Sequence, residues 1–188
     1  MNTLSKLFTR DNIRILEELS KKDELDMNEI AESTSVSPNK VHEAIHLFQE
    51  VGIIQKREVK NKIFVSYNRE SALLKKIRSL LNIFEISGLE EFKKLLGYGI
   101  VGVYGSFAKG EDRPDSDIDI WLCPSKKSSP SELVSLTKGI ENHFGKEVEL
   151  VIFSREDLDG LREKEPEFYF KIKFTSITFN GNMIELKK

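Results

Sequence analysis

The sequence predicts an α+β protein with an N-terminal helical region closed by a short β hairpin, a helical connector, and a C-terminal small mixed β-sheet with helices. Two observations lead to this prediction. Apolar residues recur at helical spacing over the first third and change to alternation near Ile53, whereas the last half holds short apolar runs of strand length, such as 148–153. We therefore expect three segments, 1–67, 68–96 and 97–188.

The composition excludes several classes of protein. The 188 residues are 39% hydrophobic and 32% charged, which is typical of a folded chain and not of a disordered one. No apolar run approaches the roughly 20 residues needed to cross a bilayer, and Met1 to Arg10 lack the apolar core of a secretory signal. The single cysteine, Cys123, excludes an internal disulfide and a multi-cysteine metal site. We expect a cytoplasmic protein without membrane contact.

The first third is expected to contain three helices and a hairpin. Asp11 is placed to cap the first helix, and Asp26 with Glu29 three residues later has the spacing of a capping box for the second. Pro38 suits the first position of a third helix, which Gly52 ends. Two β runs follow, at 53–59 and 63–67, joined by a turn at 60–62. The segment 1–67 therefore resembles a winged helix-turn-helix domain.

Such a domain could contact DNA. The candidate residues lie at the start of the third helix, on the first β run and at the hairpin tip: Asn39, Lys40, Lys56, Arg57, Lys60 and Lys62. Residues 1–70 nevertheless hold 11 basic and 12 acidic residues, a poor balance for binding phosphates. DNA binding and protein contact therefore stay open as alternatives for this segment.

The connector carries a wide apolar face at helical spacing over residues 70–96. This face must pack on the flanking segments or on a second copy of the chain. A homodimer through residues 70–96 is therefore one expectation.

The residues with the clearest chemistry follow a predicted buried strand at 100–104. Gly105 permits a sharp turn and a close backbone approach, and Ser106 supplies a hydroxyl at an expected helix start, where phosphate is favoured. Asp117 and Asp119 are two residues apart on a predicted strand, so both carboxylates project from the same face. Two close anions repel unless cations neutralise them, and Mg²⁺ prefers carboxylate and phosphate oxygens. The pattern predicts a site for Mg²⁺, with two ions, and a phosphate group.

The run from Gly105 to Ile120, GSFAKGEDRPDSDIDI, resembles the signature of the DNA polymerase β superfamily of nucleotidyltransferases. In that signature, Gly-Ser is followed after about ten residues by Asp-x-Asp and later by a third carboxylate within an apolar run; here 107–116 separate the two motifs. Glu149 is the best third carboxylate, and Glu147 is a weaker candidate. The small C-terminal segment is most similar to the minimal nucleotidyltransferases, which are often paired with helical toxin proteins and modify some of them with AMP.

The resemblance implies a residue for each role. Asp117, Asp119 and Glu149 would bind the metal ions, and Glu149 would also help to activate the incoming hydroxyl. Lys109 stands where this group usually has Arg, so it would offer a point charge in place of a bidentate grip. The nucleotide-binding set is Gly105, Ser106, Lys109 and Ser116. The implied reaction is the Mg²⁺-dependent transfer of an NMP group from an NTP, with ATP expected, to a hydroxyl of a protein or nucleic acid.

Other interpretations remain for the same residues. The Gly-Ser and Asp-x-Asp motifs could form only a turn and an exposed strand edge. The fold could also be idle, in a winged-helix transcriptional regulator whose nucleotidyltransferase fold senses nucleotide or acts as an antitoxin-like module without turnover. The aromatic residues of the C-terminal tail are expected to form core and not a base-stacking platform: Phe168, Tyr169, Phe170 and Phe174.

Overall fold

The computed structural model describes residues 3–180, and the chain divides into two compact units between Lys75 and Lys76. Within the described residues, no helix is both long enough and apolar enough to cross a membrane.

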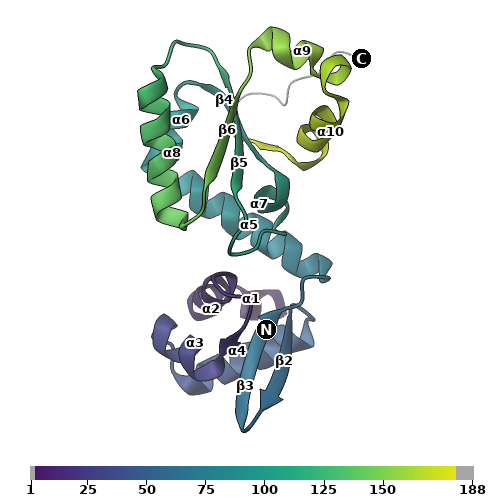
Figure 1. The fold of residues 1–188 in the computed structure, drawn as a ribbon. Coiled ribbons are helices and arrows are strands. Elements are labelled where there is room, and N and C mark those ends of the chain that lie inside the picture. The colour runs from purple at the N-terminus through teal and green to yellow at the C-terminus, as the bar shows by residue number, and fades with distance from the viewer. Residues whose placement is uncertain (1–2, 181–188) are drawn as a thin grey trace. The chain divides into compact units, whose positions relative to one another are not determined.

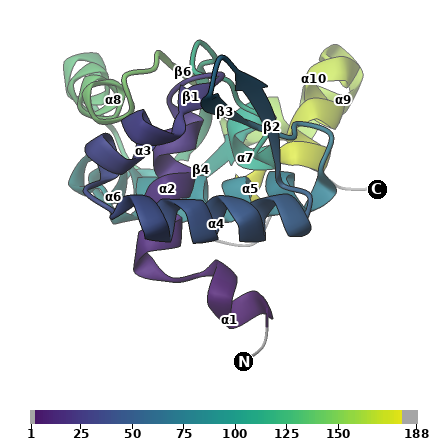
Figure 2. The same cartoon turned by 90° about the horizontal axis from the view of Figure 1, so that it is seen from below.

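The first unit contains helices and a three-stranded antiparallel sheet of order β1-β3-β2. Figure 2 shows α4 running in front of α2 and α3. Its elements are α1 (Thr3–Leu7), α2 (Arg10–Ser20), β1 (Leu25–Asp26), α3 (Met27–Thr34), α4 (Pro38–Glu50), β2 (Ile54–Val59) and β3 (Lys62–Tyr67). The three expected helices and the hairpin are therefore present, whereas α1 and β1 were not expected.

The starts of the three expected helices of the first unit follow the sequence in two cases. Asp26 and Glu29 form the expected capping box of α3, and Pro38 opens α4. The expected cap of α2 was wrong, because Thr9 caps this helix by accepting a hydrogen bond from the backbone N–H of Asn12 at 3.3 Å. Asp11 lies inside the first turn, where its charge is still favourable.

The second unit centres on a four-stranded mixed sheet of order β6-β5-β4-β7, in which β5 and β6 are parallel and the other pairs antiparallel. The division between the units falls within the first turn of α5 (Ala72–Gly88), and the rest of this helix belongs to the second unit. The remaining elements are α6 (Glu90–Leu96), β4 (Gly99–Tyr104), α7 (Gly105–Lys109), β5 (Ile118–Pro124), α8 (Pro130–Phe144), β6 (Val148–Ile152), α9 (Arg155–Lys164), α10 (Pro166–Thr175) and β7 (Ile177–Thr178). The mixed sheet expected from the sequence is confirmed.

Helices cover both faces of this sheet (Figure 1). On one face, apolar side chains of β4 and β5 pack with α5, α6, α7 and α8. On the other face, Tyr104, Trp121 and Cys123 pack with side chains of α9 and α10. Because side chains alternate along a strand, residues of odd and even number in β5 belong to different cores. Asp119 therefore shares the second face with Trp121.

Candidate functional site

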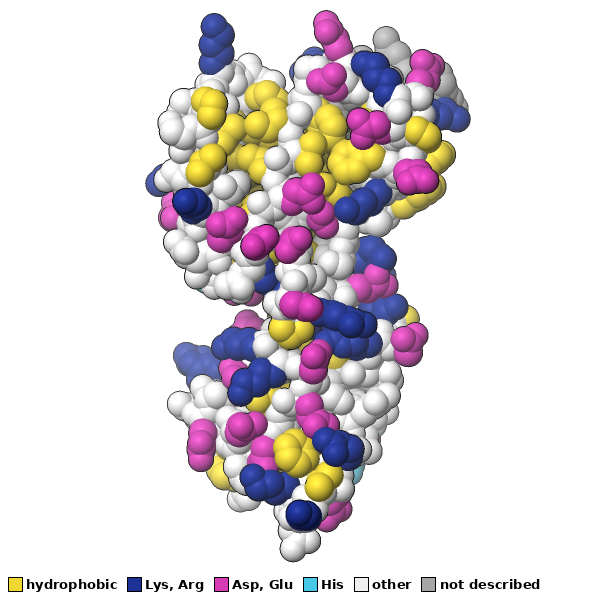
Figure 3. Space-filling view, in the orientation of Figure 1, with side chains coloured by type: hydrophobic (Ala, Val, Ile, Leu, Met, Phe, Trp, Pro, Cys, Tyr) yellow, Lys and Arg dark blue, Asp and Glu magenta, His cyan; other side chains and the backbone are white. Residues whose placement is uncertain are grey.

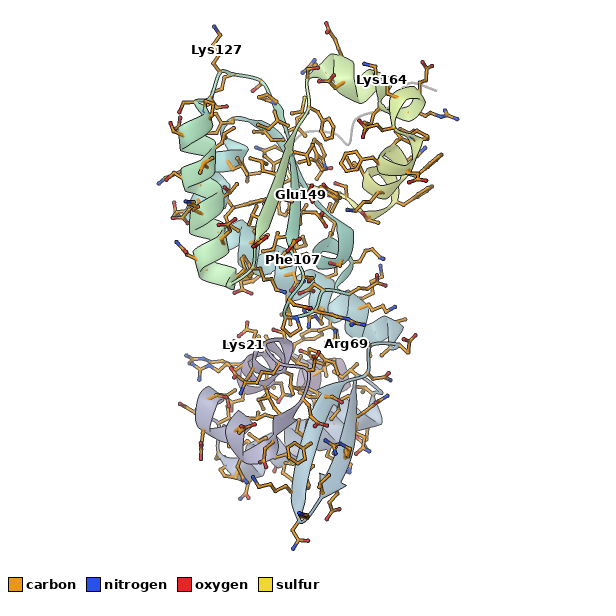
Figure 4. The ribbon with its side chains drawn as sticks, viewed as in Figure 1. Lys21, Arg69, Phe107, Lys127, Glu149 and Lys164 are labelled. Carbon is orange, nitrogen blue, oxygen red and sulfur yellow. The ribbon has the colours of Figure 1, made fainter. Side chains whose placement is uncertain are left out.

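Three side chains form a row across the sheet on the face covered by α10. Tyr104 lies opposite Asp119 in the antiparallel pair, and Asp119 lies beside Glu149 in the parallel pair. Residues paired in this way project from the same face. Tyr104 is fully buried, the Asp119 side chain is 13% exposed, and Glu149 is exposed. The row thus runs from the core to solvent, and Figure 4 shows its exposed member, Glu149, on β6.

The Tyr104 hydroxyl is the buried end of this row. Within the described residues it has no hydrogen-bond partner. Burial, followed by the charges of Asp119 and Glu149, raises the pKa of the Tyr104 hydroxyl well above its usual value. The hydroxyl is therefore a protonated donor close to both carboxylates, and such buried donors are ordinarily satisfied.

Helix α10 contributes two polar side chains to the site that the sequence did not single out. The Lys171 ammonium lies 3.3 Å from Asp119 Oδ1 and 4.8 Å from the centroid of the Tyr104 ring. Thr175 Oγ1 accepts a hydrogen bond of 3.1 Å from the backbone N–H of Gly105. Both residues lie more than 50 positions from their partners, so no local pattern could have indicated them.

Gly105 lies directly against the Asp119 carboxylate. Its φ of +71° is in the left-handed region, and a Cβ added here would lie 1.9 Å from Asp119 Oδ2. The backbone therefore comes close to a carboxylate of the row, and the close approach to a ligand expected from the sequence stays a prediction. Only glycine satisfies both the backbone conformation and the space.

We expect Gly105→Ala to lower the free energy of unfolding of the second unit by more than Gly145→Ala does. Gly145 has a similar φ of +63° but open space around it, so its alanine variant experiences backbone strain alone, about 1–2 kcal/mol. The Gly105 variant must in addition displace the Asp119 carboxylate. Urea unfolding followed by the fluorescence of Trp121, the single tryptophan, measures both. Equal losses in the two variants would contradict the contact with Asp119.

The other expected nucleotide-binding residues lie in and after α7. Ser106 is half-buried in the first turn of α7. Lys109 is exposed and forms an ion pair with Glu111. The Ser116 hydroxyl accepts from the Arg113 N–H and donates to the Arg113 carbonyl, both at 2.9 Å. The structure therefore brings Gly105 to the row, whereas Lys109 and Ser116 have local partners.

The three carboxylates expected to bind metal are not gathered into one group. Asp119 and Glu149 are in register, but Asp117 is exposed and lies just before β5 begins. Among the described residues, no group of three or more His, Cys, Asp or Glu side chains is placed to hold a metal ion. The carboxylate oxygens of Asp119 and Glu149 are the kind of donor that a hard divalent cation prefers. The three-carboxylate site stays a prediction.

A buried polar network holds the loop before Asp117. The Asp112 carboxylate, 2% exposed, accepts from Arg78 at 2.7 Å and from Asn82 at 2.9 Å. Lys146 lies 3.7 Å from the same carboxylate and donates to the carbonyls of Arg113, Pro114 and Ser116. Burial lowers the pKa of the Lys146 ammonium, and the Asp112 charge opposes this by raising it. The network was missed from the sequence because its members come from separate elements.

Several of the candidate DNA-binding side chains of the first unit are ion-paired. The Lys40 ammonium lies 2.6 Å from Asp11 Oδ2, and the Lys62 ammonium lies 3.4 Å from Asp26 Oδ2. Nη2 of Arg57 lies 2.5 Å from Glu24 Oε2. Within the described part of the chain, Lys56 and Lys60 form no ion pair, and Asn39 is exposed. The basic surface expected from the sequence is thus partly neutralised by its own neighbours.

Comparison with known protein families identifies the class of protein to which this mixed sheet with its carboxylate pair belongs. The sequence profile of the family described as Polymerase beta, Nucleotidyltransferase matches residues 90–165, which include the whole row. Protein adenylyltransferase MntA of Thermococcus cleftensis is 31% identical over 81 residues, which cover 43% of this chain and 78% of that protein. The chain therefore belongs to the polymerase β nucleotidyltransferase family.

Further similarities concern the first unit and two solved structures. A profile of the family described as HVO_A0114 matches residues 7–72 of the first unit. Among solved structures, a toxin–antitoxin complex with AMP-PNP gives a TM-score of 0.37 at 19% identity, over 52% of this chain and 78% of that chain. A mutant MntA–HpeT toxin–antitoxin complex gives a TM-score of 0.36 at 19% identity, over 50% of this chain and 76% of that chain.

Proposed function

We propose that the second unit is a metal-dependent nucleotidyltransferase that moves AMP from ATP to a hydroxyl group of a protein. Family membership supports nucleotide transfer, and the name of the relative, protein adenylyltransferase, supports ATP as donor and a protein as acceptor. The observation that carries the proposal is the pairing of Asp119 with Glu149 beside the close backbone approach of Gly105. Figure 3 shows acidic side chains gathered on the face where Figure 4 places Glu149.

In this proposal the acidic residues hold the cation and the backbone near Gly105 receives the phosphates. Asp117, Asp119 and Glu149 would hold Mg²⁺ through carboxylate oxygens. Bound Mg²⁺ would neutralise the triphosphate and stabilise charge on the transferred phosphoryl group. Ser106 follows Gly105 in the first turn of α7, and the contact of Gly105 with Asp119 supports a phosphate position beside that carboxylate.

The transfer itself is an in-line displacement at phosphorus. The acceptor oxygen forms a bond to the α-phosphorus, the bond to the oxygen that bridges to the β-phosphate breaks, and pyrophosphate leaves with that electron pair. Glu149 is exposed at the outer end of the row, where a protein hydroxyl can reach it. Its carboxylate can accept the hydroxyl proton during the attack.

The proposal is tested by incubating the full chain with ATP, Mg²⁺ and hydroxyl-bearing protein acceptors, including the chain itself. Label at the α-phosphate should appear on the acceptor with one pyrophosphate released for each AMP transferred, and EDTA should stop both. Label at the γ-phosphate should not be transferred, which separates this reaction from a kinase reaction. ATP binding without pyrophosphate release would favour the alternative, a nucleotide sensor or antitoxin-like module without turnover.

For the first unit we propose a winged helix-turn-helix module that contacts DNA weakly through its hairpin. Helices α2 to α4 and the β2–β3 hairpin support the fold, and Lys56 and Lys60 on the hairpin support the contact. The ion pairs of Lys40, Arg57 and Lys62 weaken it, since each acid competes with phosphate. The alternative use of this unit is protein contact.

The slope of log affinity against log salt is negative for a DNA-binding protein. We expect the double substitution Lys56→Gln and Lys60→Asn to make it less steep by about two, because each lysine displaces about one counterion from DNA. Asparagine suits position 60, where φ is +46° in the hairpin turn. A gel-shift series in salt measures the slope. Lys21→Gln, which removes a lysine paired with Glu18, is the control. A wild-type chain that binds no DNA at low salt would leave protein contact as the use of this unit.

The homodimer expected through residues 70–96 stays a prediction. Leu80 and Phe84 of α5 are exposed by 58% and 77%, so the apolar face contains uncovered side chains. A second copy of the chain or a protein partner could cover them.

A further inference from the structure

We propose that Lys171 is a phosphate-binding residue of the nucleotidyltransferase site. Its ammonium pairs with Asp119 in the free protein and moves to the oxygens of the triphosphate when nucleotide and metal bind. This inference rests on the proposed function of the second unit. It adds a cation from α10, an element that the motif from Gly105 to Asp119 does not include.

The position of Lys171 is fixed by two contacts. Its ammonium lies 3.3 Å from Asp119 Oδ1, and it lies 4.8 Å from the Tyr104 ring centroid in a cation–π arrangement. The side chain is 46% exposed, whereas that of Asp119 is 13% exposed. The ammonium therefore approaches the row from solvent and can leave Asp119 without becoming buried.

The ion pair has little structural value of its own. A half-exposed lysine at this distance gains modest Coulomb energy and loses side-chain freedom. The α10 helix is anchored instead by apolar side chains, since Tyr169 and Ile172 lie in the core with Trp121. Lys171 is therefore available for a role in the site.

Lys171 and a metal ion compete for the same carboxylate. Oδ1 of Asp119 faces the ammonium, and Oδ2 faces the Gly105 backbone, so a divalent cation on Asp119 must displace or share the position of Lys171. The triphosphate that accompanies the cation offers new anionic oxygens within reach of a long, flexible stem. Lysine binds phosphate as a point charge, which suits such a transfer.

Lys171 also supplies the charge that Lys109 was expected to supply. Lys109, the last residue of α7, is paired with Glu111, two residues further along the chain. Among the described residues, Lys171 is the lysine or arginine that forms an ion pair with an acid of the row. The site thus receives its positive charge from the far end of the chain and not from the loop motif.

The test compares Lys171→Met with Lys173→Met in the full chain. Lys173 is on the same helix and also lies over a tyrosine ring, that of Tyr169, but it does not contact Asp119. Mn²⁺ binding to nucleotide-free protein is followed by electron paramagnetic resonance, and ATP binding by calorimetry with Ca²⁺. We expect Lys171→Met to tighten Mn²⁺ binding severalfold and to weaken ATP binding about tenfold, whereas Lys173→Met changes neither.

The opposite signs of the two effects separate this role from a structural one, because a distorted site would lose both ligands. Lys171→Gln, which keeps a polar side chain at this half-exposed position of α10, repeats the measurement if the methionine variant does not fold. Equal behaviour of the Lys171 and Lys173 variants, or parallel loss of Mn²⁺ and ATP, overturns the role of Lys171 while AMP transfer by the wild type still supports the proposed function. A wild type that binds neither ligand overturns both proposals.

Discussion

Replacing Asp119 with asparagine is expected to lower the rate of AMP transfer by about a thousandfold, because the amide has the shape of the carboxylate but cannot neutralise a cation. Asp119 is the central member of the row, between Tyr104 and Glu149, and its carboxylate touches Gly105. The isosteric change keeps this packing. Initial rates of transfer of α-labelled AMP measure the effect.

The matched control for this variant is Asp115→Asn. Asp115 is an exposed aspartate of the loop that precedes β5, outside the sheet and the row. It should transfer AMP within a factor of about two of the wild type. Similar rates for the Asp119 variant and the wild type would show that the row does not carry the chemistry. Unchanged Mn²⁺ binding in the Asp119 variant would contradict the metal site separately.

Replacing Asp112 with alanine is expected to lower the free energy of unfolding of the second unit by about 3–5 kcal/mol, since it leaves a buried guanidinium without its counter-ion. The side chains of Arg78 and Asp112 are 6% and 2% exposed, so water cannot compensate. Asn82 and Lys146 lose a partner in the same change. Urea unfolding followed by Trp121 fluorescence reports on this unit, because Trp121 lies in its core.

The double variant Arg78→Met with Asp112→Leu is the matched comparison. It removes both charges and replaces them with apolar side chains, so its loss should be smaller than that of Asp112→Ala alone. A loss below about 1 kcal/mol in the alanine variant would mean that the pair behaves as an exposed one. A double variant less stable than the single one would mean that shape, and not charge, holds the loop.

The elements of the fold could be predicted where local chemistry determines them. The capping box of Asp26 and Glu29 and the proline at the start of α4 use contacts within one turn, and both are confirmed. The strands β4 and β6 could be recognised by their apolar runs. The cap at Asp11 was wrong because Thr9, two residues earlier, also has a side-chain oxygen that suits the role. Strand β1, of two residues, is too short to leave a pattern.

The site could be predicted only as far as one motif extends. Gly105, Asp119 and Glu149 lie together because the motif specifies a turn, a strand and a neighbouring strand. Lys171 and Thr175 reach the site from α10, and their positions depend on how that helix packs on the sheet. The pairing of Lys109 with Glu111 likewise depends on rotamers and not on spacing. Domain boundaries at 67 and 96 stay predictions.

The parallel alignment of β5 and β6 has a consequence for how the chain avoids misfolding. A shift of β6 by one residue would turn Glu149 toward the apolar core formed with α8, and would bring Val148 and Leu150 out of it. Burying an unpaired carboxylate is strongly unfavourable, so the slipped pairing is penalised at the outset. Glu149 can therefore act as a register marker: the same charge that suits catalysis rejects the wrong alignment of the strand that carries it.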